Sequence, residues 1–172
     1  MSARPYFIAG VMMMGAMALA SITCVRPAQA QTKQQIDACE LKNNPTNEQQ
    51  IDGCTAMIQS SWYSGQSLAA AFYNRANAYS RKGEFDRSIQ DYDEAIKLNP
   101  GFASAFYNRG NAFGNKGQID RAIQDFDEAI RLNPRSANAF FSRSIAKTRK
   151  GDKAGAAADM AQARRINPNI PK

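Results

Sequence analysis

The chain has 172 residues, 44% of them hydrophobic, which suits one soluble unit with an adequate core. The net charge of +7 is a modest excess without a long basic run, so a nucleic-acid-binding polycation is not indicated. Histidine is absent, which removes the commonest general base and metal ligand of proteins. Composition therefore disfavours both catalysis and nucleic-acid binding.

The first thirty residues have the pattern of a secretory signal peptide. Arg4 precedes an uncharged, mainly apolar run at 6–25, and Ala28-Gln29-Ala30 is a small-x-small cleavage site. We therefore expect cleavage after Ala30 and export, to a bacterial periplasm. The run approaches the about 20 residues that span a bilayer, so an uncleaved membrane anchor is the alternative. Acylation of Cys24 as a lipoprotein fits less well, because the three residues before it depart from the usual pattern.

Two cysteines, Cys39 and Cys54, remain after such a cleavage. An even number in an oxidising compartment is most simply one disulfide, with two free thiols as the alternative. Residues 33–43 and 47–60 are predicted short helices. Counting about 1.5 Å per residue from the turn between them places the cysteines at similar heights, so the bridge would staple this hairpin. Redox or metal chemistry is disfavoured, because the spacing is not C-x-x-C and histidine is missing.

A 34-residue unit occurs three times after this hairpin, at 69–102, 103–136 and 137–170. The first two copies match at 22 of 34 positions, and the third matches the second at 13. In the middle copy, apolar or small residues recur at three- and four-residue spacing on both sides of Gly117. This predicts two helices, with Gly117 as a left-handed cap between them and Asn133-Pro134 as the end of the second.

The middle copy resembles a tetratricopeptide repeat (TPR). The family's pattern of aromatic, Leu, small, aromatic, Ala, aromatic, Ala and Pro falls here on Phe106, Arg109, Gly110, Phe113, Ala122, Phe126, Ala129 and Pro134. Only the Leu position departs. The resemblance covers 69–170 and implies an all-α, right-handed α-solenoid of helix-turn-helix repeats that binds a partner without a cofactor. It does not identify that partner.

Residues 31–68 precede the repeats and fill about one further period. Most of their positions miss the repeat pattern, so we interpret them as a divergent helical cap over the apolar side of the first repeat, with 61–66 as its connecting loop. Trp62 and Tyr63 in this loop are expected to pack down more readily than to contact a partner. At the other end, Arg164 replaces the isoleucines of the earlier copies, which predicts a surface that meets water and an array of three repeats.

The arginines in the Leu position recur together with aspartates sixteen residues later. The three pairs are Arg75 with Asp91, Arg109 with Asp125, and Arg143 with Asp159. Since a half-buried, unpaired arginine would be costly, we predict a salt bridge within each repeat. The alternative is an arginine ladder that binds anionic ligands.

In the TPR family, ligands usually lie along the concave face formed by the first helices. Carrying this face over gives the predicted partner-binding groove: Tyr73, Asn74, Asn77, Arg81, Tyr107, Asn108, Asn111, Asn115, Phe141 and Arg149. Ile145 falls on the same face. The rings offer rigid contact area, and the amides can bond an extended peptide backbone. Alternatively, the asparagines are solvated consensus residues.

Two further features of the sequence bear on the kind of ligand. The clamp that grips two carboxylates of a chaperone needs basic residues where this chain has Tyr73, Asn138 and Ser142, so no such clamp is expected. A basic edge of Arg81-Lys82, Lys116 and Arg149-Lys150 could attract an acidic partner. Cations are also stabilised at helix C-termini, which carry a negative partial charge, and we favour this explanation for the basic residues.

We therefore predict a non-enzymatic scaffold of the cell envelope that binds a protein or peptide, with no metal, nucleic acid or small-molecule substrate. The carboxylate clusters at 91–94 and 125–128 recur at the same repeat positions and so belong to the scaffold. Two alternatives remain open. One is a membrane-tethered component of an envelope assembly, which requires an uncleaved N-terminal segment, and the other is a structural module that acts through its convex side.

Overall fold

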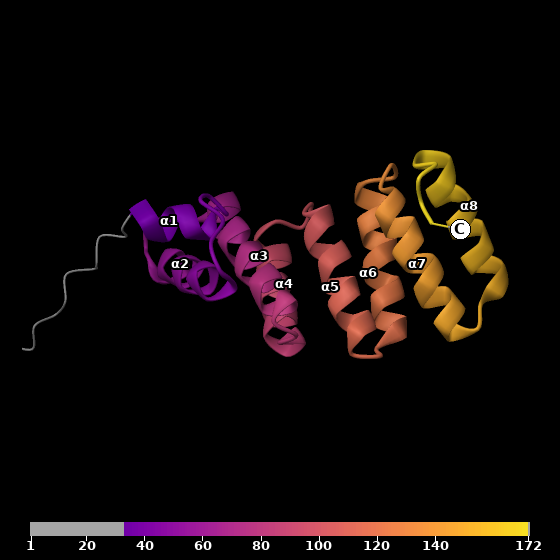
Figure 1. Cartoon of the computed structure of the whole chain (residues 1–172), viewed down its shortest axis with the longest axis horizontal. Coiled ribbons are helices and arrows are strands. Elements are labelled where there is room, and N and C mark those ends of the chain that lie inside the picture. Colours follow the sequence, from indigo (N-terminus) through magenta and orange to yellow (C-terminus); the bar gives the residue numbers. More distant parts are fainter. Residues whose placement is uncertain (1–32, 172) are drawn as a thin grey trace, which may run out of the picture.

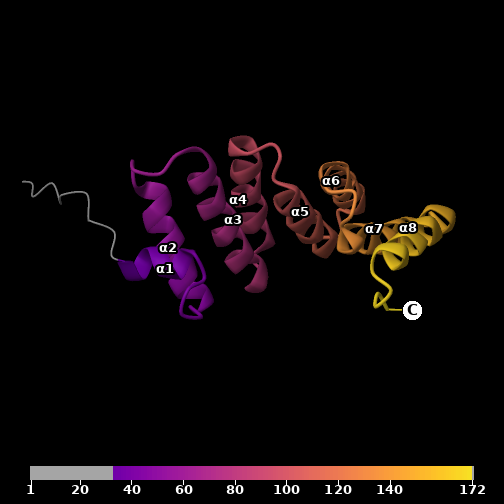
Figure 2. The ribbon, with the colours of Figure 1, turned by 90° about the horizontal axis from the view of Figure 1, so that it is seen from above.

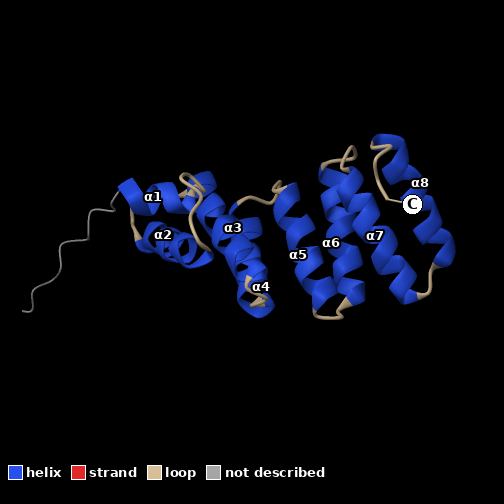
Figure 3. Cartoon of the chain, viewed as in Figure 1, coloured by secondary structure: helices blue, strands red, loops and turns tan. Residues whose placement is uncertain are grey.

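The computed structural model describes residues 33–171, all of whose regular elements are helices (Figure 3). The predicted signal peptide, its cleavage after Ala30, and Cys24 lie outside the described residues. The helices in chain order are α1 (Lys33–Cys39), α2 (Asn47–Gln59), α3 (Gly65–Arg81), α4 (Phe85–Leu98), α5 (Ala103–Asn115), α6 (Ile119–Leu132), α7 (Ala137–Lys150) and α8 (Lys153–Ile166). The predicted all-α fold is confirmed for this part of the chain.

The helices pack as four consecutive hairpins along the long axis of the molecule (Figures 1 and 2). Each hairpin packs only against its neighbours in sequence, as expected for a solenoid. Within residues 33–171, α3 contacts α5 and α5 contacts α7, whereas α4 and α6 do not touch, nor do α6 and α8. The first helices of the repeats are therefore the closer layer, which makes theirs the concave side.

Close packing within a hairpin depends on small residues. In the middle repeat, a Cβ atom added to Gly110 would lie 2.8 Å from Cε1 of Phe126, so glycine lets α5 approach α6. Ala122 and Ala129 are buried at the same interface. Gly117 has a φ of 74° at the turn between the helices, which is the left-handed cap predicted from the sequence.

The first hairpin, α1 and α2, is joined by a disulfide between Cys39 and Cys54, as predicted. Helix α2 begins with a capping box in which Thr46 and Gln49 each bond the other's backbone amide. The cysteines form a small core with Met57 and Ala71, so the same cluster joins this hairpin to α3. The cap and the first repeat therefore share buried surface.

The structure differs from the sequence-based expectations around this cap. Helix α2 ends at Gln59 and α3 begins at Gly65, so the connecting loop covers 60–64 rather than the predicted 61–66. Trp62 was expected to pack down, but 71% of its surface is exposed. Tyr63, in contrast, packs against the core of the cap.

The C-terminal surface also differs from the expectation. Arg164 was predicted to meet water, but the chain after α8 folds back over it. Ile170 is buried, and Nη2 of Arg164 donates to the backbone carbonyl of Pro171 at 2.9 Å. The arginine is consequently half-buried rather than fully solvated.

Candidate functional site

The arginines of the Leu position form bidentate ion pairs inside the repeats. Arg109 bonds both carboxylate oxygens of Asp125, through Nε at 2.8 Å and Nη2 at 2.7 Å. The same geometry occurs between Arg75 and Asp91 and between Arg143 and Asp159. All three aspartates are buried. These arginines thus hold the two helices of a repeat together.

The same arginines also reach back to the preceding unit, which the sequence analysis did not predict. Nη1 of Arg109 bonds Asp93 on α4 at 2.5 Å, and Nη1 of Arg143 bonds Asp127 on α6 at the same distance. In the first repeat, Nη1 of Arg75 bonds the hydroxyl of Thr55 on α2 at 3.0 Å. Because these N–H donors are already bonded within the protein, the guanidinium groups are not available to bind an anionic ligand. Asp93 and Asp127 recur at a 34-residue interval, and this recurrence could have indicated the contacts between repeats.

Equivalent carboxylates in the second and third repeats titrate differently. Burial raises the pKa of Asp125 above its ordinary 3.8 even though Arg109 opposes the shift. Burial also favours a higher pKa for Asp159, but the hydrogen bonds from Arg143 and Lys147 outweigh the effect of burial, and the pKa is lowered. Lys147 lies 2.9 Å from Asp159 and supplies the second cation. The third repeat therefore holds its carboxylate more firmly in the charged form.

Half of the predicted groove is closed by its own hydrogen bonds. Nδ2 of Asn108 donates to the hydroxyl of Tyr73 at 3.1 Å and to Oδ1 of Asn77 at 2.8 Å, and the Tyr92 hydroxyl donates to the same oxygen at 2.6 Å. Burial raises the pKa of Tyr92, which keeps this donor protonated. Three residues predicted for the groove, Tyr73, Asn77 and Asn108, are thus tied into an internal network of the first two repeats.

Two other predicted groove residues contact the cap instead. Nδ2 of Asn74 donates to the backbone carbonyl of Cys39 at 2.9 Å. Arg81 donates to Asn47 through Nε at 2.7 Å and also bonds Gln50, both on α2. These contacts position the cap on α3 and leave neither side chain directed at a ligand.

The C-terminal half of the groove is open. A hollow of about 380 Å³ lies between α5, α6 and α7, with Asn111, Gly114, Asn115, Ser142, Ile145 and Arg149 on its lining. Within the described residues, the side chains of Asn111 and Asn115 have no hydrogen-bond partner. Arg149 makes one contact, from Nη1 to the backbone carbonyl of Gly114 at 3.3 Å. Tyr107 and Phe141 are half-buried on the adjoining face.

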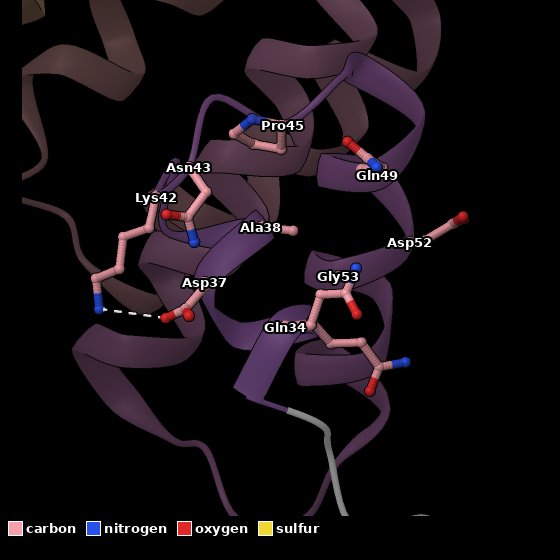
Figure 4. Close-up of a pocket in the computed structure, with 10 residues that line it drawn as sticks. Gln34, Asp37, Ala38, Lys42, Asn43, Pro45, Gln49, Asp52 and Gly53 are labelled. Atoms are coloured by element: carbon pink, nitrogen blue, oxygen red, sulfur yellow. Dashed lines mark ion pairs between the residues drawn. The ribbon is translucent and has the colours of Figure 1, made fainter.

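The larger hollow, about 470 Å³, lies in the cap and not in the predicted groove. Figure 4 shows Asp37 and Lys42 on one side of it and Gln49 and Asp52 on the other. Its two charged groups on the α1 side pair with each other at 3.7 Å. Its position at the outer end of the array separates it from the aromatic and amide side chains of the first helices, so we place the candidate site in the groove.

The three lysines of the basic edge are neutralised by ion pairs. Lys82 bonds Glu48 and Glu84, each at 3.2 Å, while Lys150 bonds Asp120 at 2.7 Å. Lys116 pairs with Asp86. These lysines bridge successive units, which favours a structural role over the attraction of an acidic partner. Within residues 33–171, no group of three or more metal-ligating side chains is placed to hold an ion, and no helix has the length and apolarity to cross a bilayer.

Comparisons with known proteins agree with this architecture. A family model described as "TPR repeat" matches residues 76–117, and one described as "Tetratricopeptide repeat" matches 103–136. No curated protein matches the chain.

Solved structures share the fold at low sequence identity. MamA is 24% identical with a TM-score of 0.65, over 71% of this chain and 69% of that chain. YrrB, described as a TPR protein with an unusual peptide-binding site, is 18% identical with a TM-score of 0.64, over 72% of this chain and 62% of that chain. The first TPR of Spaghetti (RPAP3), bound to an HSP90 peptide, is 21% identical with a TM-score of 0.60, over 63% of this chain and 86% of that chain.

Proposed function

The chain belongs to the tetratricopeptide-repeat family, and on that premise we propose that it is a non-enzymatic scaffold that holds a segment of a partner protein in its concave groove. The observation that carries the proposal is the open hollow between α5, α6 and α7, which offers unpaired amides beside apolar side chains. YrrB and the Spaghetti repeat are described as binding peptides, which supports the same role here.

A crosslinking experiment in cells tests the proposal. A photoreactive residue at position 111 faces the hollow, whereas one at the exposed Gln124 of α6 lies outside its lining and is the matched control. We expect position 111 to trap a defined protein that position 124 does not trap. A synthetic peptide that covers the trapped site should then bind the purified chain. Equal trapping from both positions would refute groove binding and favour the convex-side module.

We further propose that the protein works outside the cytoplasm, as an exported component of a bacterial envelope. The disulfide between Cys39 and Cys54 supports this location, because such bonds persist in oxidising compartments. N-terminal sequencing of the protein isolated from cells distinguishes the two forms considered. A chain that starts at Gln31 is the cleaved, periplasmic form, and one that retains residues 1–30 is the membrane-tethered assembly component.

A further inference from the structure

At one position of the concave face, an aliphatic residue in the third repeat replaces an amide of the first two repeats. Asn77 and Asn111 occupy it in the first two copies, and Ile145 occupies it in the third. Ile145 lines the open hollow and has 40% of its surface exposed. A single exposed aliphatic residue is ordinary on a protein surface. Its placement in a hollow, at a position that is polar in the other copies, is what indicates a ligand contact.

Charge on the lining limits what the ligand can be. Arg149 is the one charged residue on the lining of this hollow, and no carboxylate lies there. Nearby acids are already engaged, since Asp120 pairs with Lys150 and Asp152 caps the backbone amide of Gly155. A negatively charged group of the ligand would therefore meet Arg149 without repulsion from the lining.

The unpaired amides favour an extended ligand backbone over a helical one. Asn111 and Asn115 lie four residues apart on α5, so they project from one face of that helix. Each amide can donate to a carbonyl and accept from an N–H group. An extended strand presents such groups, whereas a helical partner has satisfied most of them internally.

The spacing of the two specificity contacts follows from helix geometry. Ile145 and Arg149 are four residues apart on α7, about 6 Å along the helix axis. In an extended peptide, side chains on one face are two residues apart, about 6.6 Å. An aliphatic residue and an acidic residue separated by one intervening residue therefore match the two contacts.

Resting on the proposed function, we infer that the hollow between the second and third repeats takes an extended peptide segment whose aliphatic side chain packs on Ile145 and whose carboxylate, two residues away, pairs with Arg149.

Synthetic peptides on the purified full chain test this assignment. The probes are end-blocked nonapeptides with one Leu and one Glu in a Ser-Gly background, separated by zero, one, two or three residues and made in both orders. A further peptide replaces Glu by Gln at the matching spacing. Fluorescence anisotropy gives the dissociation constants. We expect one order of the one-residue spacing to bind about fivefold or more tighter than the other spacings and the Gln peptide.

Variants of the chain separate the two contacts. Ile145→Asn restores the residue of the other repeats and should weaken the best peptide about tenfold. Arg149→Gln should weaken it about threefold and remove the preference for Glu over Gln. The controls are Leu41→Asn, which removes an aliphatic residue exposed outside the groove, and Arg135→Gln, which removes an exposed arginine outside the hollow. Both controls should bind as the unaltered chain does, and circular dichroism should show unchanged helicity in all four.

The outcomes distinguish this inference from the proposed function. Equal affinity for all spacings, or equal loss in the Ile145 and Leu41 variants, would overturn the inference. The same holds if the three-residue spacing binds best, since that is the spacing of a helical ligand. If no peptide of the set binds while position 111 still traps a partner in cells, the inference fails and the groove remains a binding site. If neither binding nor trapping occurs, both fail.

Discussion

Replacing Arg109 by methionine tests the claim that one arginine holds the middle repeat together. The substitution keeps an unbranched apolar stem and removes the guanidinium. It leaves Asp125, whose side chain is 7% exposed, without its bidentate partner, and Asp93, which is 52% exposed, without a surface contact. An unpaired buried charge costs about 3 kcal/mol, and the surface pair contributes about 0.5 kcal/mol. The expected loss in the free energy of unfolding is therefore about 3 kcal/mol.

Urea unfolding followed by far-UV circular dichroism measures this loss. The double variant Arg109→Met with Asp125→Asn removes both charges of the buried pair, so we expect it to recover about 2 kcal/mol of the loss. Arg131→Met is the matched control, because Arg131 is 64% exposed and pairs with Glu128 on the surface. Its expected cost is about 0.5 kcal/mol. The slope of the transition should be compared as well, since a changed slope would report separate unfolding of single repeats.

Two results would contradict the reasoning. If the Arg109 and Arg131 variants lose equal stability, burial does not govern the value of these pairs. If the double variant is no more stable than Arg109→Met alone, the loss comes from packing of the arginine stem rather than from the unpaired Asp125.

Three further predictions follow from the structure. Replacing Cys39 and Cys54 by serine should cost about 3 kcal/mol of stability in the chain-entropy model, and two alkylatable thiols in the unreduced, isolated protein would show that the bridge is absent. Carbon-detected NMR titration should give opposite pKa shifts for two aspartates. The folded pKa of Asp159 is lowered, so its stabilising contribution is present above 3.8 and lost as pH falls through the folded value. The folded pKa of Asp125 is raised, so its stabilising contribution is present below pH 3.8 and lost as the pH rises through the folded pKa. If both pKa values shift in the same direction, the assigned causes of the shifts are wrong. Gly114→Ala should raise the free energy of unfolding, measured with urea, by about 0.5–1 kcal/mol, because an added Cβ meets only an ordinary 3.9 Å contact. A loss of stability would mean that α5 and α6 lie closer than described.

Sequence periodicity was sufficient for the helices and the hairpins, because one apolar face at three- and four-residue spacing allows few other arrangements. The pairs at sixteen-residue spacing, such as Arg109 with Asp125, could also be anticipated, since both residues lie within one hairpin whose geometry is local. Contacts between repeats were harder to predict from the sequence. Asp93 recurs in register with Arg109, but its choice of partner depends on the rotation between successive hairpins.

The groove residues show a different limit of sequence reasoning. Asn77, Asn108 and Asn111 are the same residue type on the same face, yet the first two bond each other and the third is open. Two residues differ between the repeats. The equivalent of Asn108 is Ser142, which bonds Tyr107 and not Asn111, and the equivalent of Tyr92 is Phe126, which carries no hydroxyl. A comparison of position 108 with 142 and of position 92 with 126 could have indicated that Asn111 stays open.

The arginine contacts also bear on how the cap is held. At the two borders between repeats, the arginine reaches a carboxylate of the preceding unit, Asp93 or Asp127. At the border with the cap, Arg75 reaches only the neutral hydroxyl of Thr55, and a hydrogen bond to a neutral group is weaker than one to a charged group. The arginine contact at this border is therefore the weakest of the three, and Asn74, Arg81 and Lys82 supply the other polar contacts between the cap and α3. Because the disulfide stabilises the cap hairpin itself, reduction should loosen the cap before it disturbs the open half of the groove.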